Sequence, residues 1–221
     1  MEYFTVERCL DILGFVTGIL YLYWEYFANP KMWFAELIMP VIMVWLFFDK
    51  GLYADCAMNM YYFVIAIYGY VLWTRRRHTA KPKKGEAVSA SKSAQVKSGK
   101  GMPITHITPV KLAYSIVVFA ALYGLIAFWL ITCTDSNVPW LDAFTTALSI
   151  VAMWMLARKY VEQWLAWILV DAVSCGLYIY KGIPWSAARY AIYTAIAVFG
   201  YFKWLRLMNA NSESESDPVR S

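Results

Sequence analysis

Long apolar segments recur along this chain of 221 residues, and their length limits the folds open to it. A helix needs about 20 residues to cross a hydrocarbon core of about 30 Å. Seven segments come close to that length, and 61% of the residues are apolar against 16% charged. The expected spans are residues 10–27, 33–48, 52–74, 110–132, 139–156, 160–180 and 184–206. The sequence therefore predicts an all-α polytopic membrane protein with seven transmembrane helices.

Positive charge is concentrated in one connection between the expected spans. Residues 75–111 contain ten Lys or Arg and one acidic residue, Glu86. The segment is rich in Ser, Ala, Lys and Gly and lacks interleaved aromatic residues, which predicts a disordered linker over residues 76–109 and argues against nucleic acid as a partner. Because cytoplasmic loops are enriched in Lys and Arg, we expect this linker inside the cell. The N-terminus is then external, and the polar tail of residues 207–221 is cytoplasmic.

The chain also repeats itself with a shift of 131 residues. An ungapped comparison of residues 10–75 with residues 141–206 gives 16 identities in 66 positions, including Lys-Gly, Trp and Arg at fixed places. We expect a first three-helix repeat over residues 1–75, a linking fourth helix over 110–132 and a second repeat over 139–206. The linking helix makes these 3+1+3 repeats parallel. Parallel repeats with a site between them are typical of transporters, which alternate access across the lipid bilayer.

One expected span, residues 160–180, carries a stripe of aromatic and polar side chains. Its members follow helical spacing i, i+3, i+7, i+10 and i+14: Trp164, Trp167, Asp171, Ser174 and Tyr178. Asp171 lies near the middle of the span, where a carboxylate usually faces a cavity or a partner. Because aromatic faces attract cations, a carboxylate among Trp rings suits a flat, positively charged aromatic solute. The open alternative is that Asp171 bonds a neighbouring helix and the Trp rings only pack.

The third helix of each half carries a related stripe. Asn59 and Tyr62 in the first half correspond to Tyr190 and Tyr193 in the second. We expect Asn59 to offer an amide to a substrate and Tyr190 an aromatic wall. Small residues in these stripes allow close helix approach and are assigned to packing: Ala66, Gly69, Ala197 and Gly200. Tryptophans near span ends are expected to be either interfacial anchors or ligands: Trp33, Trp73, Trp185 and Trp204.

The remaining chemistry-bearing residues do not predict an enzyme, a metal site or a cofactor. The four cysteines lack metal-ligand spacing, and His78 and His106 lie in the expected polar linker, where they suggest no site. The sequence contains no phosphate-binding loop, catalytic triad or metalloprotease motif. Coupling of transport to protons through Glu36 or Asp171 stays open.

The segment RKYVEQWLAWILVDAVSCGLYIYKG, residues 158–182, resembles the signature of the bacterial PnuC family of vitamin transporters. The run YADCAMNMYYFVIAIYGYVLW resembles the third helix of that family. The resemblance implies a SWEET-like fold and an inner-membrane carrier that imports nicotinamide riboside by facilitated diffusion. It also implies that a cytoplasmic kinase traps the substrate, and it makes a homotrimer an expectation.

The same resemblance assigns site residues. The family's aromatic and acidic motif is matched by Trp164, Trp167 and Asp171. Its polar third helix is matched by Asn59 and Tyr62, while Gln163 stands where the family commonly has Asn. Relatives on this scaffold are thought to carry thiamine, riboflavin or deoxynucleosides, so these cargoes, thiamine above all, are alternatives. A vitamin sensor that does not transport is the second class of function.

Overall fold

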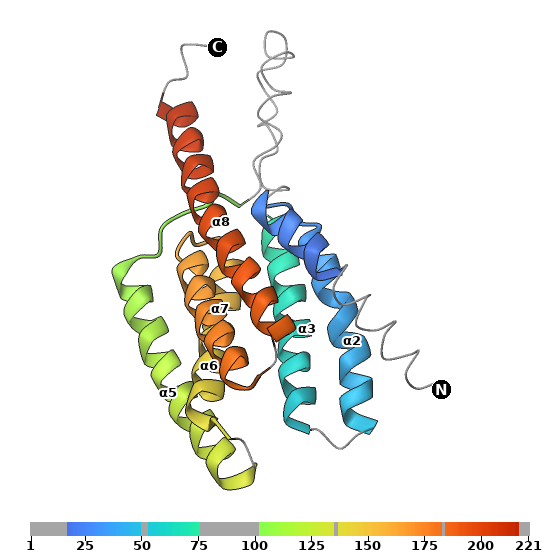
Figure 1. Ribbon diagram of the computed structural model, residues 1–221. Coiled ribbons are helices and arrows are strands. Elements are labelled where there is room, and N and C mark those ends of the chain that lie inside the picture. Colours follow the sequence, from blue (N-terminus) through green and yellow to red (C-terminus); the bar gives the residue numbers. More distant parts are fainter. Residues whose placement is uncertain (1–16, 50–52, 76–101, 135–136, 183, 217–221) are drawn as a thin grey trace. The chain divides into compact units, whose positions relative to one another are not determined.

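The computed structural model describes residues 17–49, 53–75, 102–134, 137–182 and 184–216 (Figure 1). These ranges include most of the expected helices. The start of the first expected span, the linker over residues 76–101 and the tail end over 217–221 lie outside the described residues. The chain divides into two units, Met1–Pro103 and Ile104–Ser221. The described part of both units is helical, apart from turns and an isolated bridge between Thr105 and Tyr160.

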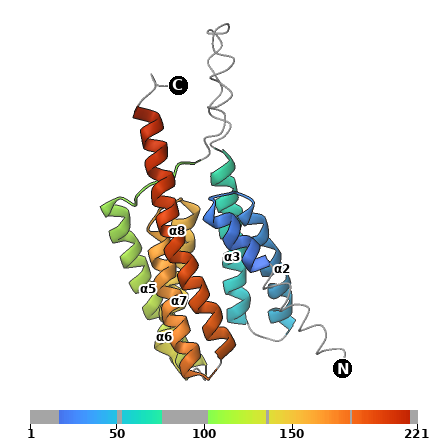
Figure 2. The same ribbon diagram turned by 45° about the horizontal axis from the view of Figure 1, so that its top comes forward.

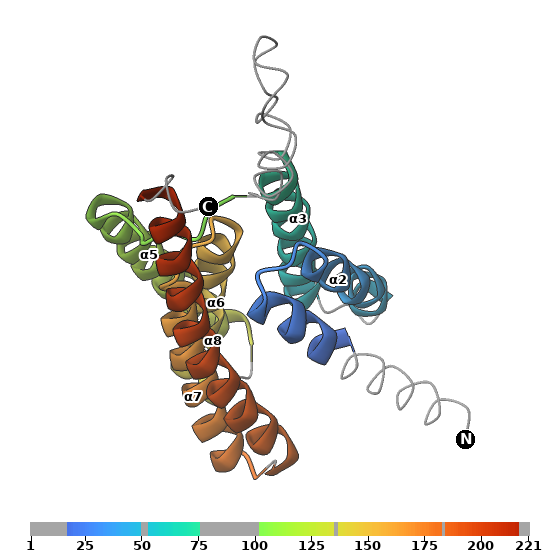
Figure 3. The ribbon, with the colours of Figure 1, turned by 90° about the horizontal axis from the view of Figure 1, so that it is seen from above.

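The described residues of the first unit form three helical segments. Residues 17–26 are helical, α2 covers Met32–Asp49, and α3 covers Tyr53–Arg75. α2 packs against α3, as Figure 3 shows from above. Pro40, which lacks a backbone N–H, lies buried inside α2.

The second unit holds α5 (Pro109–Cys133), α6 (Pro139–Ala157), α7 (Gln163–Tyr180) and α8 (Pro184–Ser216). Each of these helices packs against the next one along the chain. α5 and α6 begin with proline, which suits a first turn whose N–H groups have no helical partner. α7, which carries the predicted stripe, therefore lies between α6 and α8.

Three helices in the described part of the chain are long and apolar enough to cross a membrane: α5, α6 and α7. α5 is largely exposed, with apolar side chains such as Val117, Leu125 and Phe128 on its surface. An exposed apolar helix of 25 residues suits a lipid environment. The count of seven spans stays a prediction.

The turns that precede α2 and α7 share a positive φ angle and a backbone hydrogen bond at matching positions. Within the described residues, the non-glycine residues with positive φ are Ala28 at 50° and Lys159 at 55°, which lie 131 positions apart. The N–H of Ala28 donates to the carbonyl oxygen of Glu25 at 2.8 Å, and that of Lys159 donates to Leu156 at 2.9 Å. Left-handed backbone is unfavourable for residues with a Cβ atom. The two turns are therefore alike in a feature that seldom recurs by accident.

Aromatic packing is also alike at the helix pair of each unit. Trp33 of α2 meets Trp73 of α3 edge to face, with ring centroids 5.5 Å apart. Trp164 of α7 meets Trp204 of α8 in the same way at 5.7 Å, a favourable arrangement of aromatic rings. All four rings are buried. The expectation of interfacial anchors is therefore wrong for Trp33, Trp73 and Trp204, because they pack between helices; the side chain of Trp185 lies outside the description.

Two boundaries differ from those expected. Ile104 and Ile107 are buried although they fall inside the predicted disordered linker, because two apolar residues in a polar segment give no periodic signal. α8 continues to Ser216, past the expected span end at residue 206 (Figure 2). Hydropathy predicts only the apolar part of a helix. Polar residues can continue the helix beyond that part, so the predicted end falls short of the observed one.

Candidate functional site

The predicted stripe on α7 is largely buried. Trp164 has an exposed fraction of 1%, Ser174 of 6% and Asp171 of 8%. Trp167 and Tyr178 are half-buried. A carboxylate and a hydroxyl on one buried helical face are costly to remove from water. Such groups on an apolar helix point to polar recognition at this face.

Four buried polar atoms at the beginning of α7 have no hydrogen-bond partner in the described structure. They are both amide atoms of Gln163, Nε2 and Oε1, and the indole Nε1 atoms of Trp164 and Trp167. The Gln163 side chain is fully buried. An amide buried without a partner costs about 1–3 kcal/mol. These donors and one acceptor are therefore available to a polar ligand.

The ring of Trp164 has a second role in packing. It contacts Gly200 of α8 as well as Trp204. The assignment of Gly200 to close helix approach agrees with this contact, and Gly69 lies in the same way against Trp33. Packing fixes the Trp164 ring while its Nε1 stays unpartnered. The packing and ligand interpretations of Trp164 are thus compatible.

Tyrosines from α7 and α8 form an aromatic wall. Tyr178 stacks on Tyr190 with centroids 5.2 Å apart and planes 10° apart, and Tyr193 meets Tyr190 edge-on at 6.1 Å. Asp171 interacts electrostatically with Tyr190 and Tyr193. The structure thus brings together the second-repeat residues that the sequence placed on two helices. The sequence did not single out Arg189, whose guanidinium lies 5.4 Å from the Tyr190 ring centroid.

The predicted residues of the first repeat lie in the other unit. Asn59 and Tyr62 are both half-buried on α3. The same unit contains Glu25, which is 2% exposed and which the sequence did not single out. Glu25 and Glu36 both interact with Tyr21. A role for Asn59 and Tyr62 in binding stays a prediction.

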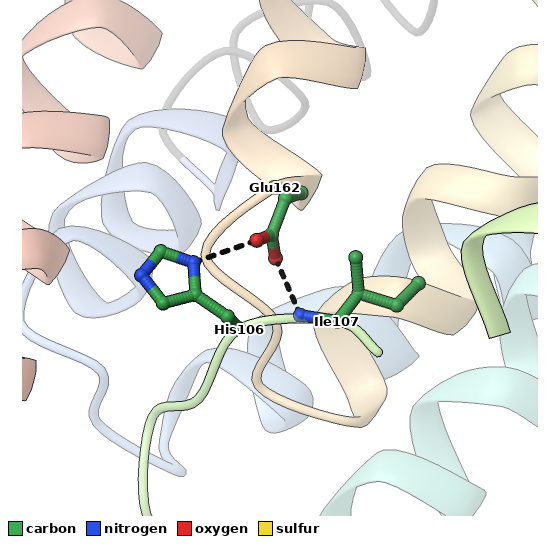
Figure 4. Close-up of polar contacts among 3 residues, drawn as sticks. All are labelled: His106, Ile107 and Glu162. Carbon is green, nitrogen blue, oxygen red and sulfur yellow. Dashed lines mark hydrogen bonds and ion pairs between the residues drawn. The ribbon is translucent and has the colours of Figure 1, made fainter. Parts of the chain in front are cut away.

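His106 and Glu162 form a contact that the sequence missed. His106 Nδ1 donates to Glu162 Oε1 at 2.7 Å, and the backbone N–H of Ile107 donates to Glu162 Oε2 at 3.0 Å (Figure 4). His106 lies in a loop as expected, but its side chain has a structural partner that the sequence did not indicate. The partners are 56 residues apart, so spacing could not reveal the pair.

The donor set suits an organic solute better than a metal ion. No group of three or more His, Cys, Asp or Glu residues gathers in the described part of the chain. The second unit instead offers one buried carboxylate, one buried amide, indole N–H groups and tyrosine rings. Few polar groups among aromatic side chains are typical of small-molecule sites.

The sequence model of one protein family, described as nicotinamide mononucleotide transporter, matches residues 8–206. The chain belongs to this family. Curated relatives of the chain are named PnuC, so the chain is a PnuC-family membrane transport protein with several membrane-crossing helices.

Relatives of the PnuC family differ in the cargo that they are named for. The nicotinamide riboside transporter PnuC of Escherichia coli K12 is 26% identical over 207 residues, which cover 89% of this chain and 84% of the relative. The riboflavin/roseoflavin transporter RibM of Streptomyces davaonensis is 26% identical over 209 residues, with coverage of 95% and 88%. The two relatives are equally similar to this chain, so sequence identity does not decide between their cargoes.

A solved structure shares the fold. The crystal structure of the vitamin B3 transporter PnuC aligns with a TM-score of 0.65 and 22% sequence identity, covering 94% of this chain and 85% of the other. The all-helical PnuC fold predicted from the sequence is therefore present in this chain.

Proposed function

We propose that this PnuC-family protein imports nicotinamide riboside by facilitated diffusion. The observation that carries the proposal is the buried polar set of α7: the unpartnered Gln163 amide, the indole N–H groups and the carboxylate of Asp171. A relative of similar length is named for the same cargo. Nicotinamide riboside is a flat aromatic cation with a carboxamide and ribose hydroxyls, which matches each of these groups.

Each proposed contact follows from simple chemistry. Tryptophan and tyrosine faces attract the pyridinium ring, and Asp171 balances its positive charge. The amide of Gln163 can donate to and accept from the carboxamide of the substrate. Ser174 and the indole N–H groups are left for hydroxyl oxygens. From the first repeat, we propose that Asn59 and Tyr62 complete the site.

Transport would follow from two parallel three-helix repeats that rock around the substrate. The matched turns at Ala28 and Lys159 support the duplication, and so do the matched Trp pairs. In this 3+1+3 scheme the protein has seven spans in the bacterial inner membrane, with an external N-terminus and a cytoplasmic C-terminus. A homotrimer of such units is the proposed assembly.

Energy would come from trapping rather than from an ion gradient. A cytoplasmic kinase that phosphorylates the riboside converts it into an anion that no longer fits a site built around Asp171. The alternative is proton coupling through Glu36 or Asp171. Equal uptake with and without a pH gradient would exclude coupling.

Two other cargoes have specific support. Thiamine is also an aromatic cation, and its aminopyrimidine can pair with the Gln163 amide, so the same site could hold it. Riboflavin has the support of the RibM relative, but its ring system is neutral and gains nothing from a buried carboxylate. The site therefore favours the two cations.

Calorimetric titration of the purified protein with nicotinamide riboside, thiamine and riboflavin, each alone, tests the cargo. Binding of the riboside alone supports the proposal, whereas binding of thiamine or riboflavin alone reassigns the cargo. Uptake of labelled substrate into sealed vesicles that contain only this protein then separates a carrier from a sensor, since a sensor binds the vitamin without accumulating it inside.

A further inference from the structure

The segment directly before α5 forms backbone hydrogen bonds with the turn between α6 and α7. The N–H of Thr105 donates to the carbonyl oxygen of Lys159, and the N–H of Val161 donates to that of Thr105, both at 3.1 Å. These two bonds form the isolated bridge of the second unit. The end of the linker is thus part of the structure that begins α7.

Glu162 adds two side-chain bonds to this backbone pairing. Its carboxylate accepts from the His106 ring on one oxygen and from the Ile107 N–H on the other (Figure 4). Its side chain is 22% exposed, against 58% for His106. Hydrogen bonds to an ionised group are stronger than neutral ones, and partial burial reduces competition from water. We call Thr105, His106, Ile107 and Glu162 the clasp.

Apolar contacts hold the clasp in place. Ile107 packs in a cluster with Val151, Met155 and Tyr160. Lys111 of α5 donates to the hydroxyl of Tyr160 at 2.9 Å and lies 5.5 Å from its ring centroid. The segment is therefore bound to α6 and to the turn by both packing and hydrogen bonds.

The matching turn of the first unit has no backbone N–H at the position that the bridge satisfies in the second unit. There the side chain of Asn29 accepts from the N–H of Lys31 at 3.1 Å. The position that corresponds to Val161 is Pro30, which has no N–H to satisfy. α7 begins without a side-chain cap of its own. The second unit thus has an extra backbone donor at this turn, and Thr105 is the acceptor that satisfies it.

We propose that Glu162 is a positioning residue that holds Gln163 and Trp164 in their binding geometry through the clasp. The two residues follow Glu162 directly, and their buried polar atoms have no hydrogen-bond partner in the described structure. Without such partners, these side chains depend on packing and on the backbone of the first turn of α7. The inference rests on the proposed function of this turn as a substrate site.

Glu162→Ala removes both side-chain bonds of the clasp, while Glu162→Gln keeps an acceptor for Ile107 N–H and offers a donor to His106. We expect about tenfold weaker riboside binding in the Ala variant, measured by calorimetry, because losing bonds to a charged group costs about one to two decades in affinity. Binding by the Gln variant should stay within about twofold of wild type. Lys31→Ala, at the matching position of the first unit, is the control and should bind like wild type.

Hydrogen exchange gives a second readout that needs no ligand. Amides of residues 161–165 should exchange faster in Glu162→Ala than in Lys31→Ala, while those of α5 stay protected. His106→Ala removes one bond of the clasp and should accelerate the same amides to a smaller extent. If Glu162→Ala misfolds, His106→Ala and Glu162→Gln still carry the test.

Unchanged affinity with unchanged exchange in Glu162→Ala would overturn the positioning role. Equal loss of affinity in the Ala and Gln variants, with unchanged exchange at residues 161–165 in the Gln variant, would also overturn it, because the negative charge would then act on the substrate directly. If the wild-type protein binds none of the three vitamins, the proposed cargo fails instead. Exchange at residues 161–165 then decides the clasp alone: faster exchange in Glu162→Ala supports it, and unchanged exchange overturns it.

Discussion

Gly200 lies so close to the indole of Trp164 that a Cβ atom at position 200 would stand 2.7 Å from the nearest ring carbons. The indole also meets Trp204, one turn further along α8, edge to face. Gly69 lies against Trp33 in the same way, and Trp33 in turn contacts Trp73. Each unit thus uses a glycine to let a buried tryptophan fit between two helices.

Gly200→Ala should destabilise the second unit. The added methyl group has to displace the Trp164 ring, and overpacking of this kind costs about 1–3 kcal/mol. We expect a lower midpoint of thermal unfolding in detergent, together with weaker vitamin binding because Trp164 moves. Gly69→Ala should lower the midpoint in the same way.

Gly124→Ala is the matched control for that experiment. It lies within α5, and a Cβ atom there would meet nothing within 4 Å. Alanine is favoured over glycine in a helix interior by about 0.5–1 kcal/mol, so this variant should unfold at the wild-type midpoint or slightly above. Equal destabilisation at positions 124 and 200 would show that the Trp164 contact is not responsible.

Asp171→Asn should weaken binding of a cationic vitamin while the protein stays folded and inserted in the membrane. The amide keeps the shape of the side chain but removes the charge that balances the pyridinium ring. We expect at least a tenfold rise in Kd for nicotinamide riboside, equal to about 1.4 kcal/mol. Calorimetry on the purified variant measures it.

A carboxylate elsewhere in the second unit provides the comparison for Asp171. Asp142 of α6 is paired with Lys181 at 3.5 Å and is partly exposed, so Asp142→Asn should leave affinity close to wild type. If Asp171→Asn binds normally, Asp171 belongs to helix packing and the charge argument for a cationic cargo is lost.

The sequence predicted the helices well because lipid-crossing length leaves a clear apolar signal. It also singled out the stripe on α7, since Asp171 and Ser174 stand out on an otherwise apolar helix, and the structure buries both. The repeat alignment placed Trp33 and Trp164 at equivalent positions, and their matching ring contacts are consistent with it.

Contacts between distant segments could not be predicted in this way. A tryptophan near a span end is compatible with an anchor, a ligand or a packing residue, and for Trp33 the burial of its ring against Gly69 and Trp73 decides for packing. His106 and Glu162 meet through a segment whose composition is that of a linker. Gln163 stands where the family motif commonly has Asn, but the motif could not show that this side chain is fully buried without a hydrogen-bond partner in the described structure.

Cysteine labelling tests the predicted orientation. If the linker is cytoplasmic, α5 runs from the inside to the outside, and Cys133 at its end faces the exterior. Cys133 is free and exposed. In a variant that retains Cys133 as its one cysteine, a membrane-impermeant maleimide added to intact cells should react with it.

Thr108→Cys in a background without other cysteines is the counterpart at the beginning of α5. Thr108 is exposed, so the introduced thiol should react only after the membrane is made permeable. Labelling of position 108 in intact cells, with protection of Cys133, would reverse the proposed topology and contradict the positive-inside assignment.

Gln163→Leu should change stability and binding in opposite directions. Leucine has a similar size but no polar atoms, so the substitution removes a buried amide that lacks a partner and should stabilise the ligand-free protein by about 1 kcal/mol or more. The same change removes the proposed donor and acceptor for the carboxamide. Riboside affinity should therefore fall at least tenfold, as measured by calorimetry beside thermal unfolding.

Met32→Leu is the control for Gln163→Leu, because Met32 occupies the matching position of the first unit and is also fully buried. An exchange of similar hydrophobic volumes costs less than about 1.5 kcal/mol and should leave affinity unchanged. Lower stability of Gln163→Leu would mean that the amide has a structural partner. Higher stability with unchanged affinity would instead exclude Gln163 from the site, because the vitamin would then bind equally well without the amide.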